Sequence, residues 1–110
     1  MTQLETQTEA IYSSLATDED LAEIVEMFVE EMPGRVETFR QQYEQSDWEE
    51  LRRTAHQLKG SAGSYGFGQI TPAAAELESA LRDGEPQVRV ERLLDAVIEL
   101  CNQATAGTPA

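Results

Sequence analysis

The stretch Thr54-Ala55-His56-Gln57-Leu58-Lys59-Gly60-Ser61-Ala62-Gly63-Ser64-Tyr65-Gly66 contains the only histidine and the only lysine of the 110-residue chain. Apolar residues recur in and before it at steps of three and four, the spacing of one helix face. They are Trp48, Leu51, Ala55, Leu58, Ala62 and Tyr65. His56 follows Ala55 and is therefore about 100° further round the helix axis. The pattern predicts a helix that buries this stripe and leaves His56 at its margin or in water.

Lys59, Gly60 and Gly63 follow His56 at three, four and seven residues, so they share one side of the predicted helix. A glycine inside a helix costs about 1 kcal/mol relative to alanine. Two glycines on one ridge are explained if another molecule must approach His56 closely, because neither glycine carries a β-carbon. An exposed nucleophilic nitrogen, a cation and a bare ridge together indicate a site that handles phosphate.

The net charge of −13 argues against binding to nucleic acid or to an anionic membrane, where a basic stripe is expected. Three of the eight basic residues, Arg52, Arg53 and Lys59, nevertheless lie close to His56. The two arginines could equally form an ordinary solvated helix face, for example by pairing Arg53 with Glu49. Cys101 is alone, which excludes an internal disulfide and favours a core residue. Without a signal peptide or a membrane-spanning run, we expect a cytoplasmic protein.

The remainder of the chain predicts further amphipathic helices joined by short connections, which favours an all-α fold, an antiparallel four-helix bundle. Helix caps and breaks are expected at Thr17, Pro33-Gly34, Ser46, Thr71-Pro72, Asp83-Gly84 and Pro86. Outside the His56 helix, the residues expected to face inward are Leu21, Ile24, Val25, Phe28, Met32, Val36, Phe39, Tyr43, Ala74, Leu77, Leu81, Val90, Leu93, Leu94, Val97, Ile98 and Cys101.

The two ends of the chain carry weaker signals. Residues 1–9 are polar and are expected to be flexible, and the small, polar tail 105–110 is expected to be disordered. A short N-terminal helical turn is predicted around Ile11, Tyr12 and Leu15. No window shows strand alternation. The single domain is therefore expected to span residues 10–104.

His56-x-x-Lys59-Gly60, with Ala62, Gly63 and Gly66 following, resembles the signature of histidine-containing phosphotransfer (HPt) domains of two-component phosphorelays. The resemblance implies a four-helix bundle whose exposed histidine carries phosphate between the aspartates of receiver domains. It implies that His56 accepts the phosphoryl group and that Lys59, together with Arg52, offsets charge on the phosphoryl oxygens. The receiver would supply the magnesium and the acidic residues for the transfer.

The same resemblance implies roles for other residues. Glu78, on the following helix, would accept a hydrogen bond from the inner ring nitrogen of His56; alternatively, it is one more solvated acid. The docking receiver would cover Gly60, Gly63 and Gln57. Apolar residues of the first helix are further candidates for this contact, although a place in the core is the commoner fate of such a stripe. These candidates are Leu21, Ile24 and Phe28.

Other function classes find little support in the sequence. One histidine cannot form a paired helical zinc site, and the glycine run lacks the strand and the Gly-Lys-Ser/Thr ending of a nucleotide loop. We expect no cofactor, no metal and no kinase activity. The expected partners of this monomer are receiver domains or a hybrid histidine kinase. Two alternatives are a helical docking module with an incidental histidine and a module of a larger kinase, for which the chain shows no kinase segment.

Overall fold

The computed structural model describes residues 10–108, which form five α-helices and two very short β-strands. In chain order these are β1 (Ile11–Tyr12), α1 (Glu19–Glu30), α2 (Met32–Glu44), α3 (Trp48–Ser64), α4 (Ile70–Arg82), α5 (Gln87–Gln103) and β2 (Ala104–Thr105). The predicted all-α class is confirmed, apart from the two strands.

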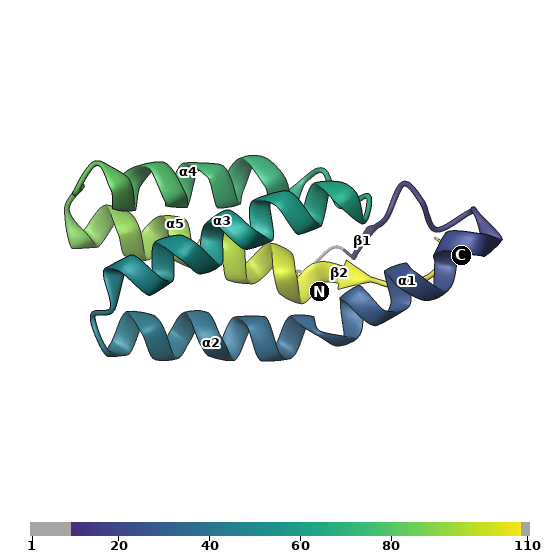
Figure 1. Cartoon of the computed structure of the whole chain (residues 1–110), viewed down its shortest axis with the longest axis horizontal. Helices are drawn as coiled ribbons and strands as arrows, with labels where there is room; N and C mark the ends of the chain where they lie inside the picture. Colours follow the sequence, from purple (N-terminus) through teal and green to yellow (C-terminus); the bar gives the residue numbers. More distant parts are fainter. Residues whose placement is uncertain (1–9, 109–110) are drawn as a thin grey trace, which may run out of the picture.

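Helices α2, α3, α4 and α5 lie alongside one another, and α1 extends beyond them from the start of α2 (Figure 1). Helix α3 packs on α2 and α4, and α5 packs on the same two helices. Therefore α3, which carries His56, lies across this group of helices from α5. None of the helices within residues 10–108 is both long enough and apolar enough to cross a membrane.

The core is built from the apolar stripes of the helices. Leu51, Ala55, Leu58 and Ala62 form the buried face of α3, as predicted, whereas Trp48 is only half-buried. The other predicted inward positions that are buried are Val25, Phe28, Met32, Val36, Phe39, Ala74, Leu77, Val90, Leu94, Val97, Ile98 and Cys101. Burial raises the pKa of the Cys101 thiol to about 11, which agrees with a place in the core.

Several predicted inward positions are wrong in degree. In the stripe of the His56 helix, Tyr65 is only half-buried, like Trp48. Outside that stripe, Ile24 is 41 % exposed, and four other predicted core residues are only half-buried. These four are Leu21, Tyr43, Leu81 and Leu93. Ile24 and Leu21 belong to α1, which extends past the other helices and so has fewer helices to pack against. At its C-terminal end α1 is anchored by Phe28, whose ring stacks on Tyr65 and Phe67 at centroid distances of 4.8 and 5.6 Å.

Two predicted N-caps are displaced by one residue. Asp18, not Thr17, caps α1 by accepting the backbone N–H of Asp20 at 2.9 Å. Asp47, not Ser46, caps α3 by accepting the N–H of Glu50. In each case an aspartate directly follows the hydroxyl residue, and its carboxylate also suits the positive end of the helix dipole.

Thr71 is not a cap, because α4 begins one residue earlier, at Ile70. Its hydroxyl instead donates to the backbone oxygen of Lys59 at 3.2 Å and so joins α4 to α3. Helix α1 ends ahead of the predicted Pro33-Gly34 break, since Glu31 alone separates α1 from α2. Pro33 lies in the first turn of α2, where its missing N–H has no intrahelical partner to lose.

The predicted N-terminal helical turn is wrong at Ile11 and Tyr12. These residues form β1, which pairs in parallel with β2 in the register Ile11 to Ala104 and Tyr12 to Thr105. The next residue, Ser13, donates its hydroxyl to the backbone oxygen of Tyr65 at 2.6 Å, so this segment is tied to the end of α3. Thr105, the first residue of the expected disordered tail, therefore lies in a strand. Residues 1–9 and 109–110 lie outside the described residues.

Candidate functional site

His56 lies near the middle of α3, one position past the fully buried Ala55. Its side chain is 63 % exposed. The buried stripe of α3 points toward the other helices, so its geometry turns the imidazole outward. The expectation that His56 lies at the margin of the core or in water agrees with this placement.

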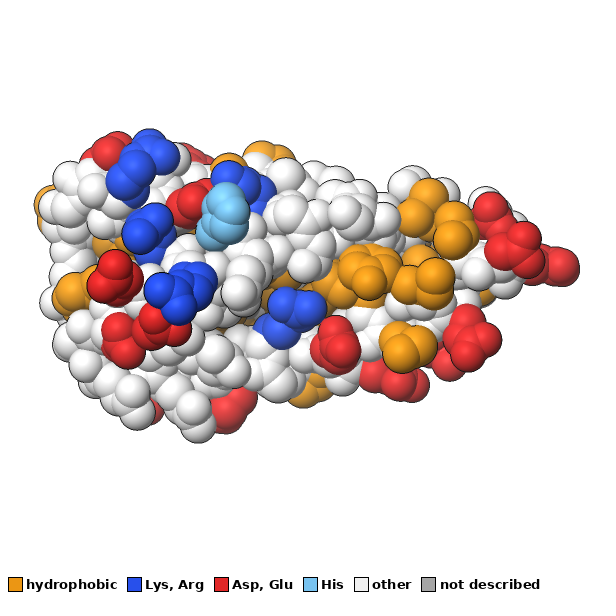
Figure 2. All heavy atoms as spheres, viewed as in Figure 1, with side chains coloured by type: hydrophobic (Ala, Val, Ile, Leu, Met, Phe, Trp, Pro, Cys, Tyr) orange, Lys and Arg blue, Asp and Glu red, His pale blue; other side chains and the backbone are white. Residues whose placement is uncertain are grey.

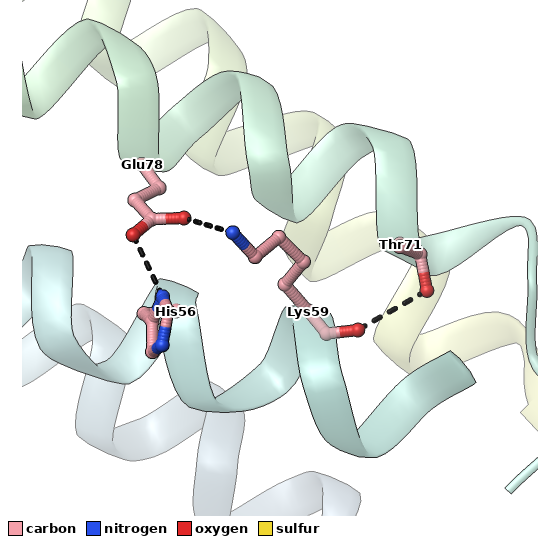
Figure 3. Close-up of polar contacts among 4 residues, drawn as sticks. All are labelled: His56, Lys59, Thr71 and Glu78. Atoms are coloured by element: carbon pink, nitrogen blue, oxygen red, sulfur yellow. Dashed lines mark hydrogen bonds and ion pairs between the residues drawn. The ribbon is translucent and has the colours of Figure 1, made fainter. Parts of the chain in front are cut away.

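Glu78 of α4 lies between His56 and Lys59 and contacts both (Figure 3). Its Oε2 is 2.8 Å from Nδ1 of His56, and its Oε1 accepts a hydrogen bond from Nζ of Lys59 at 2.7 Å. The Glu78 side chain is only 13 % exposed. The structure thus brings together three of the residues singled out in the sequence, from two helices.

The state of Glu78 determines the tautomer of His56. The hydrogen bond from Lys59 is the main cause that holds the pKa of Glu78 below its ordinary value; burial opposes this, and the hydrogen bond with His56 adds to it. The ionised carboxylate can only accept hydrogen bonds, so Nδ1 of His56 must carry the proton in this contact. In the neutral ring, Nε2 then keeps its lone pair, and within residues 10–108 it has no hydrogen-bond partner.

The two glycines beside His56 differ in their surroundings. Among residues 10–108, nothing lies within 4 Å of a β-carbon added to Gly60, so this part of the ridge is open. A β-carbon on Gly63 would lie 3.4 Å from Oγ1 of Thr71. Gly63 therefore lies close to the contact between α3 and α4 as well as on the ridge, whereas Gly60 faces open space.

Arg52 lies beside the imidazole, where it lines a hollow with Arg53, His56 and Glu78. Arg53 pairs with Glu50 at 3.2 Å, not with Glu49 as the sequence had suggested. Gln57 lines a different hollow, between α2 and α3. Arg52 is therefore placed to meet a group bound at His56, while Gln57 is turned toward α2.

An apolar patch lies on the same face as His56, toward α1 (Figure 2). Ile24 is 41 % and Met27 57 % exposed, whereas Phe28 is buried and so drops out of the three candidates. A small hollow next to Ile24 links α1 to the end of α3. Its lining residues are Leu15, Leu21, Ile24, Val25, Ser64 and Tyr65. Sequence reasoning missed Met27, although it follows Ile24 by three residues and so shares its helix face.

Comparison with known families agrees with this geometry. A family model described as the Hpt domain matches residues 23–107, which is most of the chain. The chain belongs to the Hpt domain family. No curated protein and no solved structure was found to match it. Hpt domains are carriers in histidine phosphotransfer within phosphorelays and are not kinases.

The Hpt match extends over α1 to α5 from residue 23 onward and includes His56, Lys59 and Glu78. Within the described part of the chain there is no cluster of three or more His, Cys, Asp or Glu side chains that could hold a metal ion. The site itself combines an exposed imidazole, a half-buried carboxylate and nearby cations.

Proposed function

We propose that His56 accepts a phosphoryl group from the aspartyl phosphate of a response-regulator receiver domain and returns it to the aspartate of another. The observation that carries this proposal is the contact between Nδ1 of His56 and Glu78, on a histidine that is 63 % exposed. Because Nδ1 is engaged and protonated, Nε2 of the neutral ring is the nitrogen left to act as a nucleophile. Membership of the Hpt domain family supports the same assignment.

In the proposed step, the lone pair on Nε2 attacks phosphorus in line with the bond to the aspartate oxygen. The phosphorus–oxygen bond breaks, and the receiver's carboxylate leaves as the nitrogen–phosphorus bond forms. The ring becomes positively charged, and its Nδ1–H stays hydrogen-bonded to the Glu78 carboxylate, which stabilises that charge. The reverse step begins with attack by an aspartate oxygen, so the direction follows the phosphorylation state of the partners.

Lys59 is placed to assist because its ammonium group lies near the ring but is not buried. Its side chain is 34 % exposed, and its hydrogen bond to Glu78 holds it near the imidazole, because Glu78 also contacts His56. Phosphoryl oxygens on Nε2 would bring further negative charge to this ammonium group. Arg52, in the hollow beside His56, would contact the same oxygens from the other side of the ring.

The receiver would dock on the ridge formed by His56 and Gly60 and extend over the apolar patch toward α1. The absence of neighbours at the Gly60 β-position leaves room for a partner's backbone. Gly63 and Gln57 lie at the edges of this contact in the proposal. As further parts of it, α2 to α5 form an antiparallel four-helix bundle, and the protein acts as a cytoplasmic monomer that also accepts phosphate from a hybrid histidine kinase.

The proposal is tested by mixing the protein with receiver domains labelled on aspartate and then following the label. We expect base-stable, acid-labile phosphate on the wild-type chain and none on a His56→Gln variant whose circular dichroism is unchanged. Label that persists in His56→Gln would place the acceptor elsewhere. A chain that binds receivers without taking any label would instead be a docking module with an incidental histidine.

A further inference from the structure

Charge is divided unequally along the face that carries His56. Figure 2 shows basic side chains around the histidine, with acidic ones among them, an apolar patch beyond them, and acidic side chains at the far end of α1. No lysine, arginine or histidine occurs before Arg35 in the chain. Six carboxylates fall within residues 19–31: Glu19, Asp20, Glu23, Glu26, Glu30 and Glu31. One end of this face is thus suited to an anion, and the other to a cation.

The exposed apolar residues of α1 lie among these carboxylates. Ile24 and Met27 are on one helix face, and helical spacing places Asp20, Glu23 and Glu30 next to them. All three acidic residues are exposed, and none forms an ion pair within residues 10–108, whereas Glu31 contacts Arg35 at 3.4 Å. The hollow between Ile24 and Tyr65 joins this face to the end of α3, the helix that carries His56.

Charge decides what can cover this face. A second copy that met this patch with its own α1 patch would bring the same carboxylates into opposition, and an anionic surface would be repelled in the same way. An apolar surface bearing lysine or arginine would bury Ile24 and Met27. Its cations would pair with the acidic rim of α1, which consists of Asp20, Glu23 and Glu30. A molecule docked on the His56 ridge could also reach this face, because both lie on the same side of the molecule (Figure 2).

We propose that the acidic rim of α1 selects the partner. When the phosphorylated aspartate of a receiver meets His56, another part of the receiver faces α1. This chain prefers receiver domains in which that part carries apolar residues flanked by lysine or arginine. This inference rests on the proposed function and adds to it the charge of the partner's surface. Such pairs at an interface rim act mainly on association and on discrimination between partners, and less on the chemical step. The rim should therefore affect KM more strongly than kcat.

The test uses a double variant, Glu23→Lys with Glu30→Lys, and a receiver domain that passes phosphate to the wild-type chain. We expect KM for the phosphorylated receiver to rise about tenfold or more while kcat changes by less than about twofold. For the wild type, KM should increase as salt is raised from about 50 to about 300 mM, and the variant should lose this dependence. A neutral pair, Glu23→Gln with Glu30→Gln, should fall in between.

The matched control is Asp95→Lys with Glu99→Lys on α5, which reverses two exposed carboxylates across the group of helices from α3. It should leave KM unchanged. An unchanged KM in the lysine variant, or an equal change in the control, would overturn the role of the rim while leaving phosphotransfer intact. Wild-type dimers in sedimentation that dissociate in the lysine variant would assign the face to a second copy instead. Absence of label on wild-type His56 from any receiver would overturn the proposed function itself.

Discussion

At the scale of single residues, Glu78 links the fold to the chemistry. It is held between two helices by Lys59 and in turn fixes the proton of His56 on Nδ1. Without this acceptor, the imidazole could exchange tautomers and rotate, and Nε2 would be a nucleophile for only part of the time. In the proposed function, Glu78 is therefore a positioning residue for His56.

We expect Glu78→Ala to slow phosphoryl transfer to His56 by about tenfold, because partners that orient a histidine typically have effects of this size. Glu78→Gln keeps an oxygen that can accept from Nδ1–H and should recover most of the rate. Single-turnover transfer from a labelled receiver measures both. Equal losses in the two variants would contradict a role in orienting the ring and would point to the negative charge instead.

The pH dependence of stability offers a second test of Glu78. Its pKa is lower in the folded chain, so the carboxylate stabilises the fold above the ordinary pKa of glutamate, and this contribution disappears as the pH falls through the folded value. Glu78→Gln should lower the free energy of unfolding by about 1 kcal/mol at neutral pH, since the ion pair is partly exposed. The difference should shrink below about pH 4. Urea unfolding at both pH values measures it, and a constant difference would contradict the ionic contribution.

How far single residues could be predicted depends on whether their partners are local. His56, Lys59 and Gly60 are close in sequence on one helix, so helical spacing alone placed them together. Glu78 lies 22 residues from His56 on another helix, and the residues alone could not separate a site role from an ordinary surface acid. The depth at which a side chain lies, as for Phe28 against Ile24, also depends on which helices pack against it.

At the scale of elements, the glycines on the ridge of α3 have two effects. They lower the stability of the helix, and they leave His56 accessible to a partner. Gly60 is the informative position, because an added side chain there meets no neighbour, whereas one at Gly63 approaches Thr71. A bare position inside a helix is destabilising, so its presence is best explained by what must come close to His56.

We expect Gly60→Ala to raise the free energy of unfolding by up to about 1 kcal/mol, because alanine favours the helix. Gly60→Gln should fold equally well and yet slow transfer from a receiver by about tenfold or more, since its side chain occupies the approach to His56. Gly68→Gln provides the control, because Gly68 is also exposed and open but lies after α3. Unimpaired transfer in Gly60→Gln would contradict the need for clearance.

The sequence predicted the main helices and most of their buried faces. It predicted less well the residues at which the helices begin and end, and it did not predict the two short strands. The apolar stripes predicted the buried faces of α3 and α5 because each helix carries its own periodicity. The caps shifted by one residue, since Ser46 and Asp47 both offer side-chain acceptors and only the backbone path selects between them. The pairing of β1 with β2 joins opposite ends of the chain in two-residue strands, which are too short to show alternation.

At the scale of the whole molecule, the net charge of −13 does not show that positive and negative side chains are distributed unevenly over the surface. The composition gives the number of basic residues but not their positions in space. The packing of α3 against α4, with α1 projecting beyond them, places the basic side chains near His56, then the apolar patch, then the acidic end of α1 along one face. The order comes from the fold: α3 presents His56 with its neighbouring arginines, and α1 extends its acidic face away from them.

We propose that Glu78 holds the imidazole so that Nε2 faces the phosphoryl donor. Locating the phosphate on the phosphorylated chain tests this. Nitrogen-15 and phosphorus-31 NMR of the histidine-labelled protein distinguishes the two ring nitrogens. We expect a single phosphohistidine, at Nε2 of His56, with Nδ1 still protonated. Phosphate on Nδ1, or on any residue other than His56, would contradict it.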